Sequence, residues 1–174
     1  VLLSVSGSTA TASVKAPADA RPGPHHFTVG GSNTATLIVD PAPVHHGPGV
    51  LTQFPASITG IARYRQPEQF AVNVVAGQPL VFEVRAQRFG SPVDSVLRIL
   101  DAQGKVIANN DDGKFPGTAF NKDSRIEHVF AEAGTYQVEI RNLYATTGEN
   151  FPYQISIRPP EPQVDLMLVS DHPY

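Results

Sequence analysis

Alternation of apolar and polar residues with a period of two constrains the fold of this chain more than any other feature. In segment 80–87, Leu, Phe, Val and Ala at the even positions alternate with Val, Glu, Arg and Gln at the odd ones, and segments 136–141 and 153–158 repeat the pattern. Successive side chains of a β-strand point to opposite faces, so each segment predicts a strand with one apolar face. Seven or eight such strands and no convincing helix predict an all-β chain, an antiparallel β-sandwich of jelly-roll type.

The apolar positions of these strands define the core that the sequence predicts. A sandwich buries the inward faces of both sheets, so the alternating apolar side chains should lie together between the sheets. The charged positions beside them, Glu83, Arg85 and Glu139, should face outward. The predicted core residues are Phe82, Val84, Leu97, Ile99, Tyr136, Val138, Ile155 and Ile157.

Prolines and glycines divide the chain into four parts. Residues 1–40 form short strands that resemble the end of a small sandwich, and the Pro/Gly/His-rich stretch 41–49 reads as a linker. Residues 50–160 carry the main sandwich. Residues 161–174 read as one strand, either the first of a following domain or a strand that augments another sheet. A few strands alone bury too little surface, so we expect the sequence to be a slice of a longer multidomain protein.

Composition excludes several classes of function. The 174 residues include no cysteine, which removes disulfides, thiol catalysis and thiolate metal sites. Thirteen Lys and Arg against 16 Asp and Glu give a net charge of −3, which argues against nucleic acid as a partner. No apolar run approaches the ~20 residues that span a bilayer, so no membrane span is expected.

Four aspartates are candidate metal ligands: Asp94, Asp111, Asp112 and Asp123. The hairpin at Gly104 should bring Asn109–Asp112 back beside Asp94, and Asp123 closes the loop that leaves this point. Carboxylate and carbonyl oxygens are the ligands that calcium prefers, so calcium is the ion expected at such a site. The alternative is that these side chains cap backbone amides in turns and bind no ion.

Four aromatic residues fall in loops rather than on strand faces: Phe115, Phe120, Tyr144 and Phe151. Exposed aromatic rings supply contact area at low entropic cost and could form a recognition surface for a polysaccharide or a protein. The alternative is that they fold back over the ends of the sandwich as lids.

No catalytic constellation is evident. Ser124, His128 and Asp123 are the local group of suitable residue types. Positions 124 and 128 of one strand lie about 13 Å apart, beyond hydrogen-bond reach, at ~3.3 Å per residue. We therefore expect no enzymatic activity.

The main domain resembles the bacterial pre-peptidase C-terminal domain, in particular the version found in large surface proteins of planctomycete-like bacteria. The resemblance covers about residues 56–158, and the segments that carry it are 76–84, 90–101, 104–112, 123–126 and 133–138. Residues 1–40 look like the end of the immunoglobulin-like domain that often precedes this module. Relatives in clostridial collagenases bind calcium and collagen. This chain departs from them because the neutral stretch 43–48 stands where they carry an acidic calcium-binding segment.

The resemblance implies a module outside the cytoplasm, at the cell surface or secreted, with the periplasm as a further compartment. We expect a non-catalytic β-sandwich that serves binding or adhesion within a larger bacterial surface or secreted protein. Its expected partners are neighbouring domains of the same chain and a surface polysaccharide or protein. Two alternatives remain: a structural spacer or assembly subunit that self-assembles through β-strand complementation, and an accessory domain of a secreted hydrolase.

Overall fold

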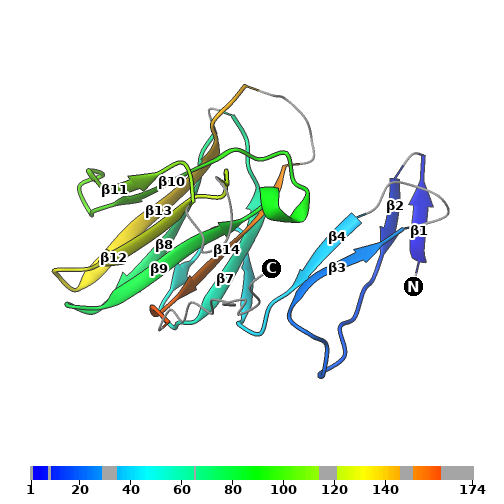
Figure 1. Ribbon diagram of the computed structural model, residues 1–174, viewed down its shortest axis with the longest axis horizontal. Coiled ribbons are helices and arrows are strands. Elements are labelled where there is room, and N and C mark those ends of the chain that lie inside the picture. Colours follow the sequence, from blue (N-terminus) through cyan, green and yellow to red (C-terminus); the bar gives the residue numbers. More distant parts are fainter. Residues whose placement is uncertain are drawn as a thin grey trace, which may run out of the picture. The chain divides into compact units, whose positions relative to one another are not determined.

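The computed structural model describes residues 2–7, 9–28, 35–64, 66–113, 121–145 and 151–161 (Figure 1). The chain divides into two compact units, Val1–Pro41 and Ala42–Tyr174, which are described separately. The described residues are nearly all β, and their helical element is a three-residue 3₁₀ turn, η1 (Gln87–Phe89). No helix among them is long and apolar enough to cross a membrane.

The first unit consists of two hairpins. Strand β1 (Leu2–Ser6) pairs antiparallel with β2 (Thr9–Ala12), and β3 (Gly23–Phe27) pairs antiparallel with β4 (Ala35–Val39). The proline-rich stretch between β2 and β3 is irregular, because proline lacks the amide hydrogen that a sheet ladder needs. The immunoglobulin-like character of this segment stays a prediction.

The second unit is a sandwich of two five-stranded sheets. Eight of its strands follow the strand order of a jelly roll, β11-β10-β13-β8 in one sheet and β12-β9-β14-β7 in the other (Figure 1). Sheet I consists of β11 (Val106–Asn110), β10 (Ser95–Leu100), β13 (Gly134–Asn142), β8 (Glu68–Val74) and β6 (Val50–Leu51). Sheet II consists of β12 (Arg125–Val129), β9 (Pro79–Arg85), β14 (Pro152–Arg158), β7 (Ala56–Ile61) and β5 (Val44–His46).

The stretch expected to be a linker belongs to the sandwich instead. Strand β5 pairs in parallel with β7, and β6 pairs in parallel with β8, so the sandwich is not wholly antiparallel. Residues 47–49, which we call the strap, cross from sheet II to sheet I between these two strands. Prolines are tolerated here because an edge strand needs hydrogen bonds on one side only.

The predicted core is confirmed at seven of its eight positions. Tyr136 is the exception: it is half-buried, packs against the core and donates its hydroxyl hydrogen to the Glu132 carbonyl, 3.1 Å away. This arrangement is typical of tyrosine, whose ring is apolar and whose hydroxyl needs a partner. The fully buried positions are Phe82, Val84, Leu97, Ile99, Val138, Ile155 and Ile157.

The charged positions beside the core lie on the outer faces, as expected, but two of them are far less exposed than the sequence indicates. Glu83 is 6% exposed and Glu139 is 8% exposed. Arg88 and Arg158 each place a terminal nitrogen 2.8 Å from a Glu83 carboxylate oxygen. Long arginine side chains lie along a sheet surface and cover it, so an outward position need not be an exposed one.

Candidate functional site

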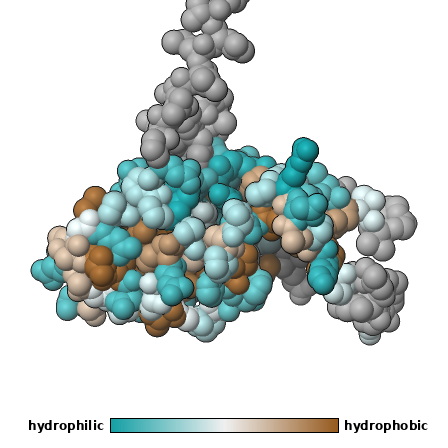
Figure 2. Space-filling model, turned by 90° about the horizontal axis from the view of Figure 1, so that it is seen from below, coloured by the Kyte–Doolittle hydropathy of each residue, from teal (hydrophilic) through white to brown (hydrophobic). Residues whose placement is uncertain are grey.

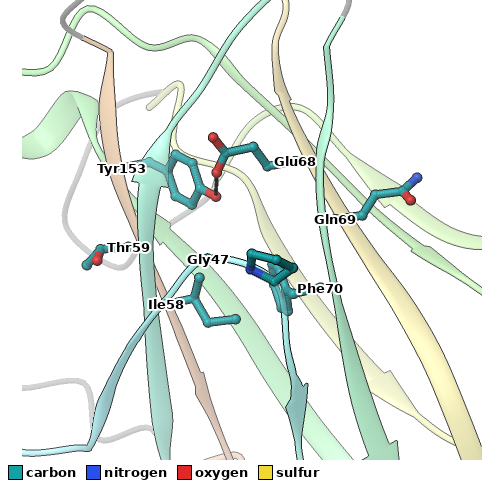
Figure 3. Close-up of a pocket in the computed structure, with 8 residues that line it drawn as sticks. Gly47, Ile58, Thr59, Glu68, Gln69, Phe70 and Tyr153 are labelled. Carbon is teal, nitrogen blue, oxygen red and sulfur yellow. Dashed lines mark hydrogen bonds between the residues drawn. The ribbon is translucent and has the colours of Figure 1, made fainter.

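A pocket opens on one side of the sandwich, between the edge regions of the two sheets. Its volume is about 280 Å³. The strap supplies one wall, and strands β7, β8 and β14 supply the others (Figure 3). The pocket therefore combines main chain from the strap with side chains fixed on strands of both sheets. Its lining includes Gly47, Pro48, Ile58, Glu68, Phe70 and Tyr153.

Glu68 and Tyr153 form the polar part of the pocket. The Tyr153 hydroxyl donates to Oε2 of Glu68 at 2.6 Å, and Figure 3 shows the two side chains pointing toward each other. Nη1 of Arg63 lies 3.5 Å from Oε1 of the same carboxylate. The Glu68 side chain is 31% exposed and that of Arg63 is 59% exposed. Glu68 is thus held from both sides and remains accessible from the pocket.

A glycine in the adjacent strand makes room for this pair. Gly60 of β7 lies directly opposite Tyr153 in the antiparallel ladder. A Cβ at position 60 would stand 2.5 Å from the Tyr153 hydroxyl oxygen and closer still to the Glu68 carboxylate. Glycine inside a strand often marks such a close approach. Gly60 therefore decides whether the pair can form.

Burial, then the hydrogen bond and the negative charge of Glu68, raise the pKa of Tyr153 well above its usual range. Below pH ~10 the phenol is neutral in the folded and the unfolded chain, so its stabilising hydrogen bond is fully present. Above pH ~10 the unfolded chain ionises Tyr153 and the folded chain does not, so the free energy of unfolding falls as pH rises.

We expect Tyr153→Phe to reduce the free energy of unfolding by about 1 kcal/mol at pH 8. That deficit should shrink between pH 10 and pH 11.5, because the variant has no phenol to ionise. Urea unfolding of both proteins across this range measures the difference. A deficit that stays constant with pH would mean that Tyr153 titrates normally.

A second, smaller cavity of about 110 Å³ shares four residues with the first: Gly47, Pro48, Ile58 and Phe70. His45 and His46 contribute to its lining. Nδ1 of His46 lies 2.6 Å from the Thr59 hydroxyl, which ties β5 to β7 by side chains as well as by main chain. The strap is therefore anchored at its start in sheet II.

The structure does not bring the four candidate metal ligands together. Asp123 is fully buried, and its carboxylate accepts hydrogen bonds from the amides of Ala86, Gln87 and Arg88 at 2.7–3.2 Å. Nε of Arg88 adds an ion pair at 2.9 Å. Asp123 thus stabilises the turn around η1, which corresponds to the alternative of capping backbone amides. Within the described ranges, no three acidic or histidine side chains are grouped as a metal site would require.

The other three aspartates do share one end of the sandwich. Burial, then repulsion from Asp111 and Asp94, raise the pKa of Asp112. Lys122 places its ammonium 2.7 Å from Oδ2 of Asp94, and this hydrogen bond raises the pKa of Lys122. The Lys122 ammonium thus supplies positive charge beside Asp94, where the sequence analysis expected a calcium ion. Calcium binding itself stays a prediction.

The four loop aromatics have different outcomes. Phe151 is 7% exposed and belongs to the hydrophobic core, which excludes it from an exposed recognition surface and agrees with the alternative that such rings fold back onto the sandwich. The reason is that it directly precedes β14, where its ring continues the apolar side of that strand. Tyr144 is 56% exposed, and the Lys122 ammonium lies 5.6 Å from its ring centroid. Phe115 and Phe120 lie outside the described residues.

Ser124, Asp123 and His128 have separate surroundings, as their spacing indicated. The Ser124 hydroxyl donates to the Ser95 carbonyl at 2.7 Å, while Asp123 contacts Arg88. His128 packs edge-on against Phe130, and burial lowers its pKa. The three side chains do not form a hydrogen-bonded relay.

Sequence reasoning missed the pocket residues. Glu68 and Tyr153 are 85 positions apart in the chain, and their contact depends on the packing of β8 and β14 from different sheets. Two signals were present in the sequence. Gly60 interrupts an otherwise strand-like run, and Glu68 occupies the same side of the alternation as Phe70 and Val72. A carboxylate on the core side of a strand indicates a specific environment.

Neither family models nor curated proteins give a match to the sequence. CorA, a surface-associated copper-binding protein important in copper acquisition by Methylomicrobium album BG8, matches with a TM-score of 0.50 and 10% identity over 67% of this chain and 100% of its own. The pre-peptidase C-terminal domain of a Bacillus anthracis collagenase matches with a TM-score of 0.45 and 13% identity over 68% and 100%. PliG of Aeromonas hydrophila, a periplasmic inhibitor of g-type lysozyme, matches with a TM-score of 0.38 and 15% identity over 66% and 98%. The likeness at a TM-score of 0.50 supports the β-sandwich as the fold of this chain.

Proposed function

We propose that the chain is a non-catalytic binding module of a larger bacterial surface or secreted protein, and that the pocket beside the strap is its binding site. The observation that carries this proposal is the pocket itself. It combines a partly exposed carboxylate, Glu68, with the apolar side chains of Ile58 and Phe70. Apolar walls with a few fixed polar groups are typical of small-ligand sites.

The rigidity of the pocket favours binding. The Tyr153 hydrogen bond orients Glu68, and Ile58 and Phe70 are buried on strands in the two sheets. A site whose side chains are already ordered loses little conformational entropy when a ligand enters. The volume of about 280 Å³ lies just below the usual range of small-molecule sites, so the pocket fits one side chain or one sugar unit.

On the face that Figure 2 shows, the described residues form no broad apolar area that would compete with the pocket. Hydrophobic residues there are interspersed with hydrophilic ones. The resemblance to the pre-peptidase C-terminal domain supports the placement outside the cytoplasm and the role as an appended module. Both remain parts of the proposal.

A second candidate is an assembly subunit or spacer. It is favoured by the short edge strands β5 and β6, which pair with only three residues of β7 and two of β8. Incompletely covered strand edges can pair with another chain. Sedimentation velocity separates the two: an assembly subunit should form concentration-dependent oligomers, whereas a binding module should stay monomeric.

An NMR titration tests the binding role. We expect at least one probe from a panel of N-acetyl amino-acid methylamides and monosaccharides to shift the amide signals of Gly60, Glu68 and Tyr153 in a saturable way. Gly60→Ala should abolish these shifts, because its Cβ displaces the Glu68–Tyr153 pair.

Gly49→Ala is the matched control, since a Cβ there meets open space and should leave binding unchanged. Well-dispersed spectra of both variants would establish that they are folded. Binding by Gly60→Ala as strong as that of the unaltered protein, or no shift at these amides with any probe, would contradict the proposal.

A further inference from the structure

We propose that the pocket takes the side chain of a lysine presented by an extended segment of a protein partner, with the lysine ammonium against Glu68. This inference rests on the proposed function and names the chemistry of the partner. It follows from the charge, the shape and the hydrogen-bonding groups of the pocket.

The charge of the lining favours a cation. Glu68 is the charged residue among those that line the pocket. Among the described residues, the cation paired with it is Arg63, which lies outside the lining, at 3.5 Å, and has a mostly exposed side chain. An exposed pair of this kind contributes little free energy, so an incoming cation can replace Arg63 at low cost. Arg63 therefore acts as a weak competitor for the site.

The hydrogen-bonding groups favour an ammonium. The Tyr153 hydroxyl hydrogen is already donated to Glu68, so the phenol oxygen is left as an acceptor beside the carboxylate. A lysine ammonium has three N–H donors, so it can donate to the Tyr153 phenol oxygen and to the Glu68 carboxylate at the same time. A guanidinium binds best to two free carboxylate oxygens in one plane, and here Oε2 is already engaged by Tyr153. Lysine therefore fits better than arginine.

The shape accommodates the rest of a lysine side chain. Ile58 and Phe70, which are both buried, and Pro48 supply apolar lining beside the Glu68 carboxylate. Lysine buries its four methylene groups along such surfaces and keeps its charged end near a polar partner. A short cation without this stem would leave the apolar walls without contacts.

The strand edge beside the pocket favours a peptide as the carrier of the lysine. The Ala71 amide donates to the strap at Gly49, 2.9 Å away, and β6 pairs with β8 only at Ala71 and Val72. Main-chain groups two residues apart in a strand point to the same edge, so those of Gln69 face the same side as those of Ala71. Gln69 lines the pocket. An extended partner can hydrogen-bond to Gln69 while its side chain enters the pocket.

The experiment is an NMR titration of the full chain with N-acetyl-lysine methylamide. We expect saturable shifts at the Gly60, Glu68 and Tyr153 amides. Glu68→Gln should weaken the affinity about tenfold, because the ammonium then meets a neutral amide oxygen in place of a charged carboxylate. Arg63→Gln should strengthen it about two- to threefold, because the competitor is removed. Glu132→Gln is the matched control and should have no effect. Glu132 lies in the turn before the start of β13, whereas Glu68 pairs with Ile140 near the other end of β13.

Three further probes distinguish the alternatives. N-acetyl-norleucine methylamide, which has an apolar stem and no charge, and n-butylamine, which has no peptide backbone, should both bind at least fivefold more weakly. Equal binding of norleucine would show an apolar pocket, and equal binding of butylamine would show a site for free amines; either result overturns the inference. N-acetyl-arginine methylamide should also bind more weakly than the lysine probe. Binding of a sugar alone would overturn the lysine assignment and leave the proposed binding function intact.

Discussion

Replacing Phe82 by alanine is expected to lower the free energy of unfolding of the sandwich by about 3–5 kcal/mol. Phe82 is fully buried on β9 and packs edge-on against Phe130, with ring centroids 6.3 Å apart. Its strand is paired on both sides, with β12 and with β14, so the backbone cannot move inward to fill the space that the ring leaves. The cost therefore includes a cavity as well as the lost burial.

Urea unfolding followed by tyrosine fluorescence measures this effect. All five tyrosines lie in Ala42–Tyr174, so the signal reports the second unit and not the hairpins of the first. Val129→Ala is the control, because Val129 is largely exposed at the end of β12 and should change stability by less than about 0.5 kcal/mol. If Phe82→Ala lowered the free energy of unfolding by no more than Val129→Ala does, the position of Phe82 in the core would be contradicted.

The sandwich and its core were predictable because they depend on local alternation. Phe82 and Val84 are apolar and Glu83 and Arg85 are charged, and this order alone places the first pair inside and the second outside. The jelly-roll type was predicted from the number of strands and the lack of a convincing helix, but the order of strands within each sheet was not predicted. Alternation does not report how far a residue on the outer face is covered. Glu83 is buried there because Arg88 and Arg158 reach it from outside its strand.

The strap and its two parallel strands were not predictable in this way. Segment 43–50 contains two prolines and two glycines and shows no alternation. Its strands form because the outer edges of β7 and β8 offer unpaired main-chain groups, a property of the assembled sheets rather than of the segment.

The pocket could not be predicted from local sequence patterns either, because it also depends on how the strands are assembled. Glu68 is the first residue of β8 and Tyr153 the second of β14, and the jelly-roll topology places these strands in opposite sheets. A sequence pattern shows that each lies on the inward side of its strand. It does not show which strand ends face each other, and therefore not that the two side chains form a hydrogen bond.

Two predictions were made for Asp123: that it joins a cluster of metal ligands, or that it caps backbone amides in a turn. The structure agrees with the second. Asp123 was expected to meet Asp94 and Asp112, because it closes the loop that leaves their end of the sandwich. The structure directs it to the turn that follows β9, where three amides and the Arg88 side chain converge on it. Four donors from one short segment satisfy a buried carboxylate that would otherwise be strongly unfavourable.

Asp123→Ala is therefore expected to reduce the free energy of unfolding by about 3–5 kcal/mol, because it removes a buried ion pair and takes the shared acceptor from three backbone amides and from Nε of Arg88. Asp101→Ala is the matched control: Asp101 also accepts two amides, from Gln103 and Lys105, but in an exposed hairpin, and its loss should cost about 1 kcal/mol.

A double-mutant cycle with Arg88→Ala separates the ion pair from the amide contacts. Asp123→Ala combined with Arg88→Ala should cost less than the sum of the two single variants, because each single change already removes the whole Asp123–Arg88 ion pair. Urea unfolding of the four proteins gives the coupling energy. If Asp123→Ala cost no more than Asp101→Ala, or if the two substitutions were additive, burial and charge pairing would not account for the role of Asp123. Its hydrogen bonds would then be worth no more than those of a surface turn.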